Sequence, residues 1–429
     1  MLKIFDASKG EEKALFAALE SRAGSETQEI AQKVRRVIED VRAQGDAALL
    51  RYCQQFDGVS LSSLCLSEQE IENCLAAVDP ALFATMQKAA ANIRAYHEKQ
   101  LCTGYEVREN GRMLGRIVRP LERVGVYVPG GTAAYPSTVL MNCIPAAVAG
   151  VGEIVLVTPP KAEGISPAVV AAAKIAGVSR IFTVGGAQAV AALAYGTQSI
   201  PAVDKIVGPG NVFVAEAKRQ VYGIVDIDMI AGPSEVLVLA DETANPAYAA
   251  ADLLSQLEHD ALASAVLITT SRALAEQVSA CIQEQMAALS RREIIAQSLK
   301  NYSGAVIVPS MEDGFAIANT IAPEHLEILT KDPYADLANV KNAGSIFLGQ
   351  YAPEPLGDYF AGTNHVLPTN GTARFSSPLS VDAFLKKMSY LCYEKQALLE
   401  DAEDIMRFAQ VEGLTAHAAS VRIRKEQEQ

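Results

Sequence analysis

The run Arg123-Val-Gly-Val-Tyr-Val-Pro-Gly-Gly131 joins an apolar, β-rich segment to a terminal Pro-Gly-Gly, and a helix of small residues is expected after it, over 135–150. Strand and helix patterns then alternate at short intervals, with further apolar strands that begin at Glu153, Arg180 and Lys205. Continuously apolar strands separated by helices are typical of a parallel sheet covered on both faces. The stretch therefore predicts an α/β fold.

A second run of the same kind begins with Glu235-Val-Leu-Val-Leu-Ala-Asp241 and continues into a long helix expected over 246–263. Further strands are expected near residues 265, 304 and 343. Two such runs predict two Rossmann-like, doubly wound parallel-sheet domains with helical N- and C-terminal segments. The expected domains are an N-terminal arm at 1–24, a large α/β domain formed by 25–122 with 235–373, a second Rossmann-like α/β domain at 123–234, and a C-terminal helical segment at 374–429.

The flanking segments carry apolar residues at helical spacing, and the first of them starts with Ser and Thr. Helices are expected over 25–42, 68–77, 80–100, 381–387 and 396–410. His97 follows Tyr96 at a charged helix end, and we expect it to be an ordinary surface residue.

Composition excludes several classes of protein. The chain has 429 residues, half of them hydrophobic, which is typical of a globular protein. Its net charge of −13 argues against nucleic-acid binding, which needs clustered Lys and Arg. No window approaches about 18 uninterrupted apolar residues, the signature of a membrane span, and the start lacks a signal-peptide pattern. Seven scattered cysteines without Cys-x-x-Cys spacing suit a reducing cytoplasm.

Glycine-rich turns follow three of the expected strands, at 128–132, 184–188 and 207–211. Glycine allows close approach of the backbone to a ligand, and the N-terminus of a following helix offers free N–H groups to a phosphate. None of the turns is a Gly-x-Gly-x-x-Gly motif. A nucleotide site and simple tight turns that need glycine are both consistent with the pattern.

Gln256 and His259 are three residues apart, so both project from one face of the helix expected there. Together with Asp358 they form a nitrogen and oxygen ligand set that zinc accepts. The alternative is a solvated helix face, to which the neighbouring charges of Glu258 and Asp260 belong.

The stretch 357–368 contains Asp358, Asn364 and His365 between glycines without helical or strand periodicity, so we expect a shaped loop. It is either part of a site or a turn whose polar side chains bond their own backbone. Glu412 and His417 lie near the C-terminus, where a ligand is useful only if the tail docks on something.

Glu324 and His325 follow a proline that is expected to start a helix, in Ala322-Pro-Glu-His-Leu-Glu327. Adjacent residues on a helix point in different directions, so the pair suits two separate proton transfers. The alternative is a capped helix start with exposed charges.

These motifs together resemble the histidinol dehydrogenase family. The similar stretches occur in the family's order and cover roughly residues 25–425: they start at Arg123, Val184, Val207, Ala231, Ser255, Ala322, Gly357 and Glu412. The resemblance implies oxidation of L-histidinol to L-histidine through the aldehyde, as the last step of histidine biosynthesis. It also implies two hydride transfers to two NAD molecules in turn, and a homodimer with shared active sites.

The resemblance further implies roles for single residues. One zinc ion per subunit would be held by Gln256, His259, Asp358 and His417, which would also contact the substrate, with His417 supplied by the other subunit. Ser234, His325, His365 and Glu412 would contact the substrate as well. Glu324 and His325 would transfer protons, and Tyr127, Gln188 and Asn211 would line the NAD site. The C-terminal segment would serve dimerisation. Leu257, Tyr359 and Phe360 are bulkier than expected for the family.

Three alternatives remain open from the sequence. One is a relative on the same scaffold that oxidises another small amino or sulfonated alcohol. The others are a zinc hydrolase and a non-catalytic protein that binds a small molecule.

Overall fold

The computed structural model describes residues 2–22, 28–130 and 135–427. Their contacts separate two compact units. The main unit comprises Met1–Gln100 and Leu121–Phe384, and the small unit comprises Leu101–Pro120 and Leu385–Gln429. None of the helices in these described ranges has both the length and the hydropathy needed to cross a bilayer.

The first predicted run forms a parallel sheet of the main unit. Among the described residues this sheet has five strands in the order β6-β5-β4-β7-β8. The strands are β4 Arg123–Tyr127, β5 Glu153–Thr158, β6 Arg180–Thr183, β7 Lys205–Val207 and β8 Asp226–Ile227. The helices that follow the first four strands are α6 Pro136–Ala149, α7 Pro167–Ala176, α8 Gly186–Tyr195 and α9 Val212–Val221. The strands expected to begin at Arg123, Glu153, Arg180 and Lys205 are confirmed, as is the helix expected over 135–150.

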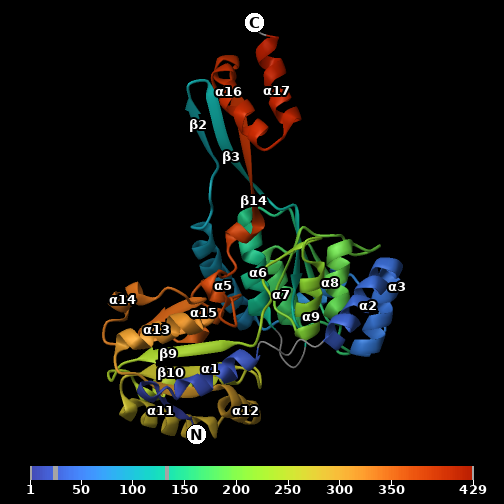
Figure 1. The fold of residues 1–429 in the computed structure, drawn as a ribbon. Helices are drawn as coiled ribbons and strands as arrows, with labels where there is room; N and C mark the ends of the chain where they lie inside the picture. The colour runs from blue at the N-terminus through green and yellow to red at the C-terminus, as the bar shows by residue number, and fades with distance from the viewer. Residues whose placement is uncertain (1, 23–27, 131–134, 428–429) are drawn as a thin grey trace. The chain divides into compact units, whose positions relative to one another are not determined.

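The second predicted run forms a second parallel sheet, with the order β1-β11-β10-β9-β12-β13 in the described part of the chain. Its strands are β1 Ile4–Asp6, β9 Glu235–Ala240, β10 Ser264–Thr269, β11 Gly304–Ile307, β12 His325–Leu329 and β13 Ser345–Leu348. The two sheets share one strand order: the first strand of each run, β4 or β9, has the next two strands of its run on one side and the last two on the other. In the second sheet β1 is added at one edge. This confirms the predicted fold of two doubly wound parallel sheets (Figure 1).

Helices cover both faces of the second sheet (Figure 1). They are α1 Glu12–Ser21, α10 Pro246–Leu257, α11 Arg272–Met286, α12 Arg292–Tyr302, α13 Met311–Ile321, α14 Pro333–Asp336 and α15 Glu354–Tyr359. Alternate residues of β9 enter different cores: Val236 and Val238 pack with α10 and α11, whereas Leu237 and Leu239 pack with α13. Burial on both faces explains why the strand is apolar throughout.

The N-terminal helices are α2 Gln28–Gln44, α3 Asp46–Tyr52, α4 Glu68–Ala77 and α5 Pro80–Glu98. The periodicity predicted α2, α4 and α5, whereas α3 was not expected. Val34 and Ile38 of α2 share a core with Leu193 of α8. In addition, β1 pairs with β11 and so belongs to the second sheet. These contacts differ from the domain boundaries expected from the sequence, which assigned the segment from residue 25 to the large domain and made residues 1–24 an arm. The start expected at Ser25 lies outside the described residues.

The small unit combines segments from two distant parts of the chain. Its antiparallel sheet has the order β14-β3-β2 within the described residues. The elements are β2 Tyr105–Glu109, β3 Arg112–Pro120, β14 Leu385–Tyr393, α16 Lys395–Val411 and α17 Thr415–Glu426. The helix predicted over 381–387 is wrong, because a short 3-10 helix ends at Phe384 and the chain then pairs with β3 along the whole of β14. The helix expected over 396–410 is confirmed as α16.

Candidate active site

A pocket of about 330 Å³ in the main unit gathers most of the predicted site residues. Its lining includes the turn Gly208–Gly210 after β7, Ser234 directly before β9, and His325 at the start of β12. The predicted residues that line it are Ser234, Gln256, His259, Glu324, His325, Asp358 and His365. Parts of the chain that are far apart in sequence therefore meet here.

His325 begins strand β12, so the prediction of a helix after Pro323 is wrong. Ala322 ends α13 with a φ of 50°, and the chain passes directly into a strand that pairs on both sides, with β9 and β13. The Nδ1 atom of His325 lies 2.9 Å from the main-chain oxygen of Glu235. A carbonyl only accepts hydrogen bonds, so Nδ1 carries the proton and Nε2 is the free nitrogen. This Nε2 is buried without a hydrogen-bond partner among the described residues.

The other two histidines of the lining are oriented in the same way. The Nδ1 atom of His259 lies 3.1 Å from the main-chain oxygen of Ser255, and Nδ1 of His365 lies 3.0 Å from that of Asp358. Each ring therefore donates from Nδ1 to the backbone and keeps Nε2 for a metal or substrate. This shared orientation is a property of the fold that sequence spacing could not reveal.

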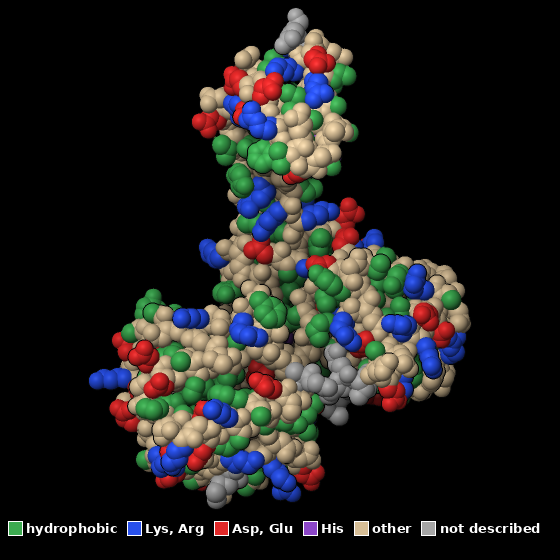
Figure 2. All heavy atoms as spheres, viewed as in Figure 1, with side chains coloured by type: hydrophobic (Ala, Val, Ile, Leu, Met, Phe, Trp, Pro, Cys, Tyr) green, Lys and Arg blue, Asp and Glu red, His purple; other side chains and the backbone are tan. Residues whose placement is uncertain are grey.

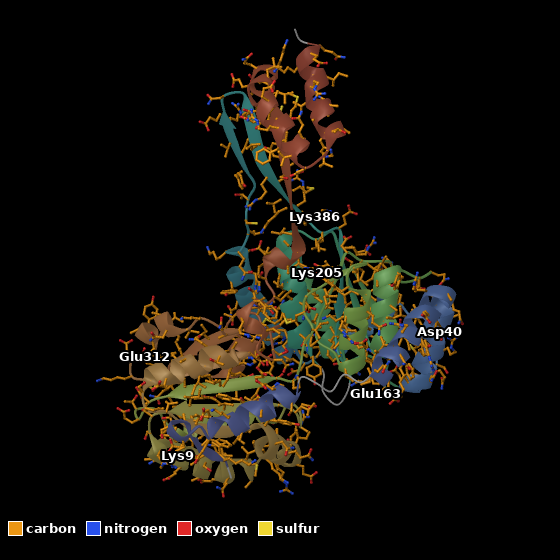
Figure 3. All side chains as sticks on the ribbon, viewed as in Figure 1. Lys9, Asp40, Glu163, Lys205, Glu312 and Lys386 are labelled. Atoms are coloured by element: carbon orange, nitrogen blue, oxygen red, sulfur yellow. The ribbon has the colours of Figure 1, made fainter. Side chains whose placement is uncertain are left out.

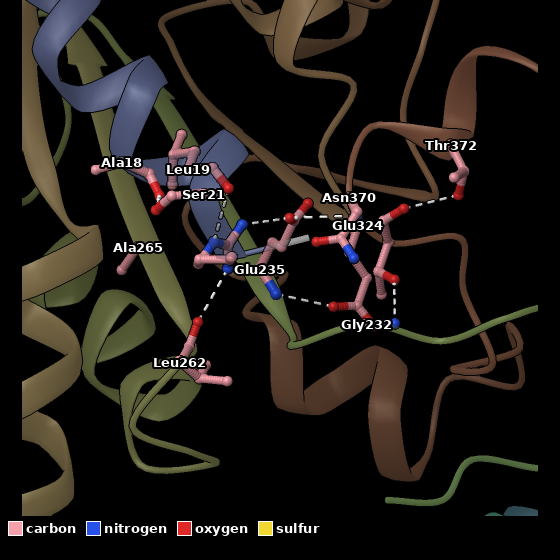
Figure 4. A network of polar contacts seen from close by, with 12 residues as sticks. Ala18, Leu19, Ser21, Gly232, Glu235, Leu262, Ala265, Glu324, Asn370 and Thr372 are labelled. Atoms are coloured by element: carbon pink, nitrogen blue, oxygen red, sulfur yellow. Dashed lines mark hydrogen bonds and ion pairs between the residues drawn. The ribbon is translucent and has the colours of Figure 1, made fainter. Parts of the chain in front are cut away.

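Glu324 is held by a buried network around Glu235 (Figure 4). The main-chain N–H of Glu235 donates to Oε2 of Glu324 at 2.8 Å, and Arg22 forms an ion pair with the Glu235 carboxylate at 2.5 Å. The main-chain N–H of Asn370 also donates to that carboxylate, at 3.3 Å. Burial raises the pKa of Glu324 to about 8, against the opposing effect of His325.

Glu354 is a site residue that the sequence did not reveal. It begins α15, four residues before Asp358, and ligand atoms of His259, Glu354 and Asp358 all lie within 4.8 Å of one another. Its carboxylate accepts a hydrogen bond from Ser255 at 2.8 Å, and burial raises its pKa to about 7. The only signal was the helical spacing to Asp358, because the contact with His259 depends on how α15 packs against α10. The loop expected over 357–368 begins only after Tyr359.

The pocket suits a divalent metal. Gln256, in the last turn of α10, is 1% exposed, and neither polar atom of its amide has a partner in the described ranges. An amide left unpaired in a buried position costs free energy unless a ligand engages it. Gln256 thus faces the same space as the nitrogen and carboxylates of His259 and Asp358, a donor set that zinc accepts. The helix ends at Leu257, earlier than predicted, so His259 lies just beyond it.

The electrostatics of the pocket depend on its carboxylates. Burial lowers the pKa of His325, but Glu324, Asp358 and Glu354 outweigh this and raise it to about 10. Burial raises the pKa of Asp358, yet the nearby imidazoles of His325 and His365 lower it to about 2. A cation held by Asp358 would oppose the protonation of His325, so its pKa would return toward the ordinary value.

The residues predicted for the nucleotide lie around the glycine turns of the first sheet. The hydroxyl of Tyr127 accepts a hydrogen bond from the N–H of Gly186 at 3.0 Å, and Gln188 packs against the same glycine. The side chain of Asn211 caps α9 by accepting from the N–H groups of Phe213 and Val214. None of these three residues lines the pocket: Tyr127 and Gln188 are buried, and Asn211 directly follows Gly210, which does line it. Residues 131 and 132 of the first glycine turn lie outside the described residues.

Glu412 and His417 belong to the small unit, and both are exposed. Glu412 directly follows α16, and His417 lies in the first turn of α17. Of the three bulky residues noted in the sequence, Leu257 is fully buried in the core of the second sheet. Tyr359 lines the pocket and Phe360 is half-exposed. Only Tyr359 of the three is therefore part of the pocket lining.

His97, predicted at the surface, is fully buried. Its Nδ1 atom lies 2.8 Å from the main-chain oxygen of Ile93, and its Nε2 atom lies 3.3 Å from the amide nitrogen of Asn364. Asn364 also donates to Met141 and accepts from Val366. The prediction was wrong because the end of α5 packs against the loop that carries His365.

A model of the histidinol dehydrogenase family matches residues 20–425 of this chain. The chain belongs to the histidinol dehydrogenase family. Histidinol dehydrogenase of Clostridium acetobutylicum is 53% identical over 411 residues, 95% of each chain. Histidinol dehydrogenase of Lactococcus lactis subsp. lactis is 51% identical over 428 residues, 99% of each chain. The crystal structure of histidinol dehydrogenase from Elizabethkingia anophelis matches with a TM-score of 0.94 at 37% identity, covering 99% of this chain and 98% of that one.

As a histidinol dehydrogenase, the chain is an oxidoreductase that oxidises histidinol in histidine biosynthesis. The family suggested by the motifs is confirmed, and with it the predicted enzyme class. The zinc hydrolase and the non-catalytic binding protein are thereby set aside.

Proposed function

We propose that the enzyme oxidises L-histidinol to L-histidine through L-histidinaldehyde, with zinc bound in the pocket and two NAD molecules reduced in succession. The observation that carries this proposal is that one pocket is lined by three histidines, each with Nδ1 beside a main-chain oxygen, and by Gln256, whose amide has no partner among the described residues. An imidazole and amine substrate needs a site with this chemistry, because its nitrogens are themselves good metal ligands.

Gln256, His259 and Asp358 would hold the metal, with His417 of the partner subunit as a further ligand. Zinc, when bound, would take the amine and imidazole nitrogens of L-histidinol and so orient the substrate. Ser234, His365 and Glu412 of the partner subunit would contact the substrate. Glu354 would fix the geometry around Asp358, since both carboxylates face His259 from the same helix.

His325 is proposed as the base for the alcohol. In the first oxidation its Nε2 takes the hydroxyl proton while the carbon transfers a hydride to NAD, which leaves the aldehyde. Water then adds to the aldehyde: Glu324 takes one proton from the water, and the protonated His325 gives its proton to the carbonyl oxygen, which yields the hydrate and restores the neutral imidazole. The hydrate loses a second hydride to a second NAD and a proton to His325, which gives the carboxylic acid. A pKa near neutrality suits Glu324 to this task.

The glycine turns would accommodate NAD. Gly208 and Tyr127 lie where the strand order reverses, at the carboxyl ends of β7 and β4, which is the usual ligand position in an open parallel sheet. A Cβ atom at Gly208 would lie 2.1 Å from the main-chain oxygen of Tyr127, so the backbone comes closer there than any other residue permits. Tyr127, Gln188 and Asn211 are proposed to line this cofactor site.

A homodimer with shared sites would explain why Glu412 and His417 are exposed on the small unit. Leu391, Phe408 and Val411 of that unit are also exposed, by 71%, 76% and 84%. Figure 2 shows apolar side chains among charged ones on its surface. Large exposed apolar side chains mark association surfaces. The same proposal places the enzyme in the cytoplasm, where its seven free cysteines stay reduced.

The test is the conversion of L-histidinol in the presence of NAD, with the product identified by mass spectrometry. We expect L-histidine, loss of turnover after chelation, and recovery when zinc is restored. A related amino alcohol without the imidazole ring should be oxidised far more slowly. Equal turnover of the two alcohols would contradict the proposed substrate.

A further inference from the structure

A buried ion pair stands directly behind the third glycine turn. Lys218 is on α9 and Asp228 follows β8, and their side chains are 3% and 1% exposed. The ammonium of Lys218 donates to Oδ1 of Asp228. Neither residue has a part in the proton transfers or the metal site proposed above.

Both members of the pair bond the backbone of the same residue, Gly208. Its main-chain N–H donates to Oδ2 of Asp228 at 2.7 Å, and its carbonyl accepts from Lys218 at 3.1 Å. Gly208 has a φ of 109°, a conformation that residues with a side chain rarely adopt. The pair therefore fixes both polar groups of a peptide unit that the chain alone would not hold in one conformation.

The fixed turn is also a wall of the active-site pocket. Gly208, Pro209, Gly210 and Asp228 line the same pocket as His325. The NAD site proposed above, beside Gly208, lies along this wall of the pocket that holds His325. Its two phosphates are anionic, so a lone carboxylate at position 228 would repel them, whereas a carboxylate neutralised by Lys218 does not.

We propose that Lys218 and Asp228 are positioning residues for NAD: they hold the Gly208 turn against the cofactor and keep the wall free of net negative charge. This inference rests on the proposed use of NAD. The alternative is a purely structural ion pair, although buried pairs often contribute little net stability relative to apolar replacements.

Single and double variants of the pair distinguish a positioning role for NAD from a purely structural role. Lys218→Met leaves a buried, unpaired carboxylate in the wall, and we expect the Kd for NAD to rise about tenfold or more, equivalent to about 1.4 kcal/mol. Asp228→Asn keeps an acceptor for the Gly208 N–H but breaks the ion pair that holds Lys218 on the Gly208 carbonyl. The turn is then less firmly fixed while no repelling charge remains, so a smaller rise in the Kd is expected than for Lys218→Met. The double variant Lys218→Met with Asp228→Asn should bind NAD better than Lys218→Met alone, because it lacks the repelling charge.

A second buried lysine in the same sheet, in an ion pair that joins β7 to β8, supplies a control. Lys205, labelled in Figure 3, begins β7 and pairs with Asp226 at 2.8 Å, at the opposite end of these strands from the Gly208 turn. Lys205→Met should leave the Kd for NAD unchanged. Its effect on the melting temperature shows what the loss of a lysine ion pair from this sheet does to stability.

Calorimetric titration of zinc-loaded protein with NAD measures the Kd directly, and steady-state kinetics give separate KM values for NAD and L-histidinol. The proposal requires a raised Kd and KM for NAD, an unchanged KM for L-histidinol and unchanged zinc content in the Lys218 and Asp228 variants. The proposal is overturned if Lys218→Met and Asp228→Asn both fold and both bind NAD with the wild-type Kd. It is also overturned if the double variant binds NAD no more tightly than Lys218→Met. If the wild type itself bound no NAD, the proposed function would fail instead. Should Lys218→Met not fold, Asp228→Asn alone must still raise the Kd.

Discussion

The Nδ1 atom of His325 lies 2.9 Å from the main-chain oxygen of Glu235, and the main-chain N–H of Glu235 bonds Glu324. One residue of β9 therefore orients both proposed proton-transfer groups. The bond leaves Nε2 of His325 as the basic nitrogen, and it faces the carboxylate of Asp358 at 3.7 Å.

Replacement of His325 by Gln should remove the base without emptying the pocket. We expect kcat to fall by about 10²–10⁴-fold, the usual contribution of a positioned general base. Zinc content and the Kd for NAD should stay at wild-type values, because neither proposed site includes this Nε2. Single-turnover experiments measure the rate constant of the chemical step itself. A decrease of less than about threefold in that rate constant would show that His325 is not the base.

The buried contact between His97 and Asn364 should matter for the substrate, although His97 is outside the pocket. His97→Leu leaves the amide of Asn364 without one partner, so the free energy of unfolding should fall by about 1–3 kcal/mol. The loop that carries His365 should lose its fixed position, and KM for L-histidinol should rise. Tyr96→Leu, at an exposed neighbour on the same helix, is the control. An unchanged KM for L-histidinol in His97→Leu would refute the coupling.

Glu327 should make the stability of the protein depend on pH. It is fully buried beside Asp252, and burial together with that carboxylate raises its pKa well above the ordinary value of 4.5. A carboxyl whose pKa is raised by folding stabilises the protein below the unfolded value, and this contribution is lost as the pH rises through the folded value. Glu327→Gln keeps the acceptor for the Glu354 N–H and cannot ionise, so its stability should fall less as the pH rises.

Melting temperatures of metal-free wild type, Glu327→Gln and the exposed control Glu293→Gln, recorded from acidic to alkaline pH, check this prediction. Parallel curves for wild type and Glu327→Gln would mean that Glu327 does not retain its proton in the folded protein.

Shared sites in a homodimer predict complementation. His259→Ala and His417→Ala subunits should each be inactive, and an equal mixture should regain about a quarter of wild-type activity, because half the dimers are mixed and each has one complete site. A mixture of His259→Ala and Gln256→Ala should regain no activity. Each site takes both Gln256 and His259 from a single subunit, so every site in the mixed dimer lacks one of the two ligands. If the first mixture also stayed inactive after proven subunit exchange, His417 would not act across the dimer.

Apolar periodicity was sufficient to predict both parallel sheets, because strands such as β9 are buried on two faces and tolerate few polar residues. It failed where pairing with a distant segment decides the local structure. Residues 385–387 read as the end of a helix, yet β3 offers an antiparallel partner along all of β14. His325 follows a proline that suggests a helix start, yet β9 and β13 on either side impose a strand.

The motif residues of the site were predicted from the sequence, whereas the groups that orient them were not. Asp228 is a single acidic residue without a local pattern, and Glu354 offers only its helical spacing to Asp358. Their neighbours in space, Gly208 and His259, come from other elements. The direction of each imidazole is set by main-chain carbonyls, which the sequence does not encode locally. Contacts of this kind follow from packing and require coordinates.

The most direct test of the central claim is the molar ratio of NADH formed to L-histidinol consumed at completion. Two successive oxidations in one pocket predict a ratio of two, with L-histidine as the product and no free aldehyde accumulating. A ratio of one, with aldehyde released, would contradict the account.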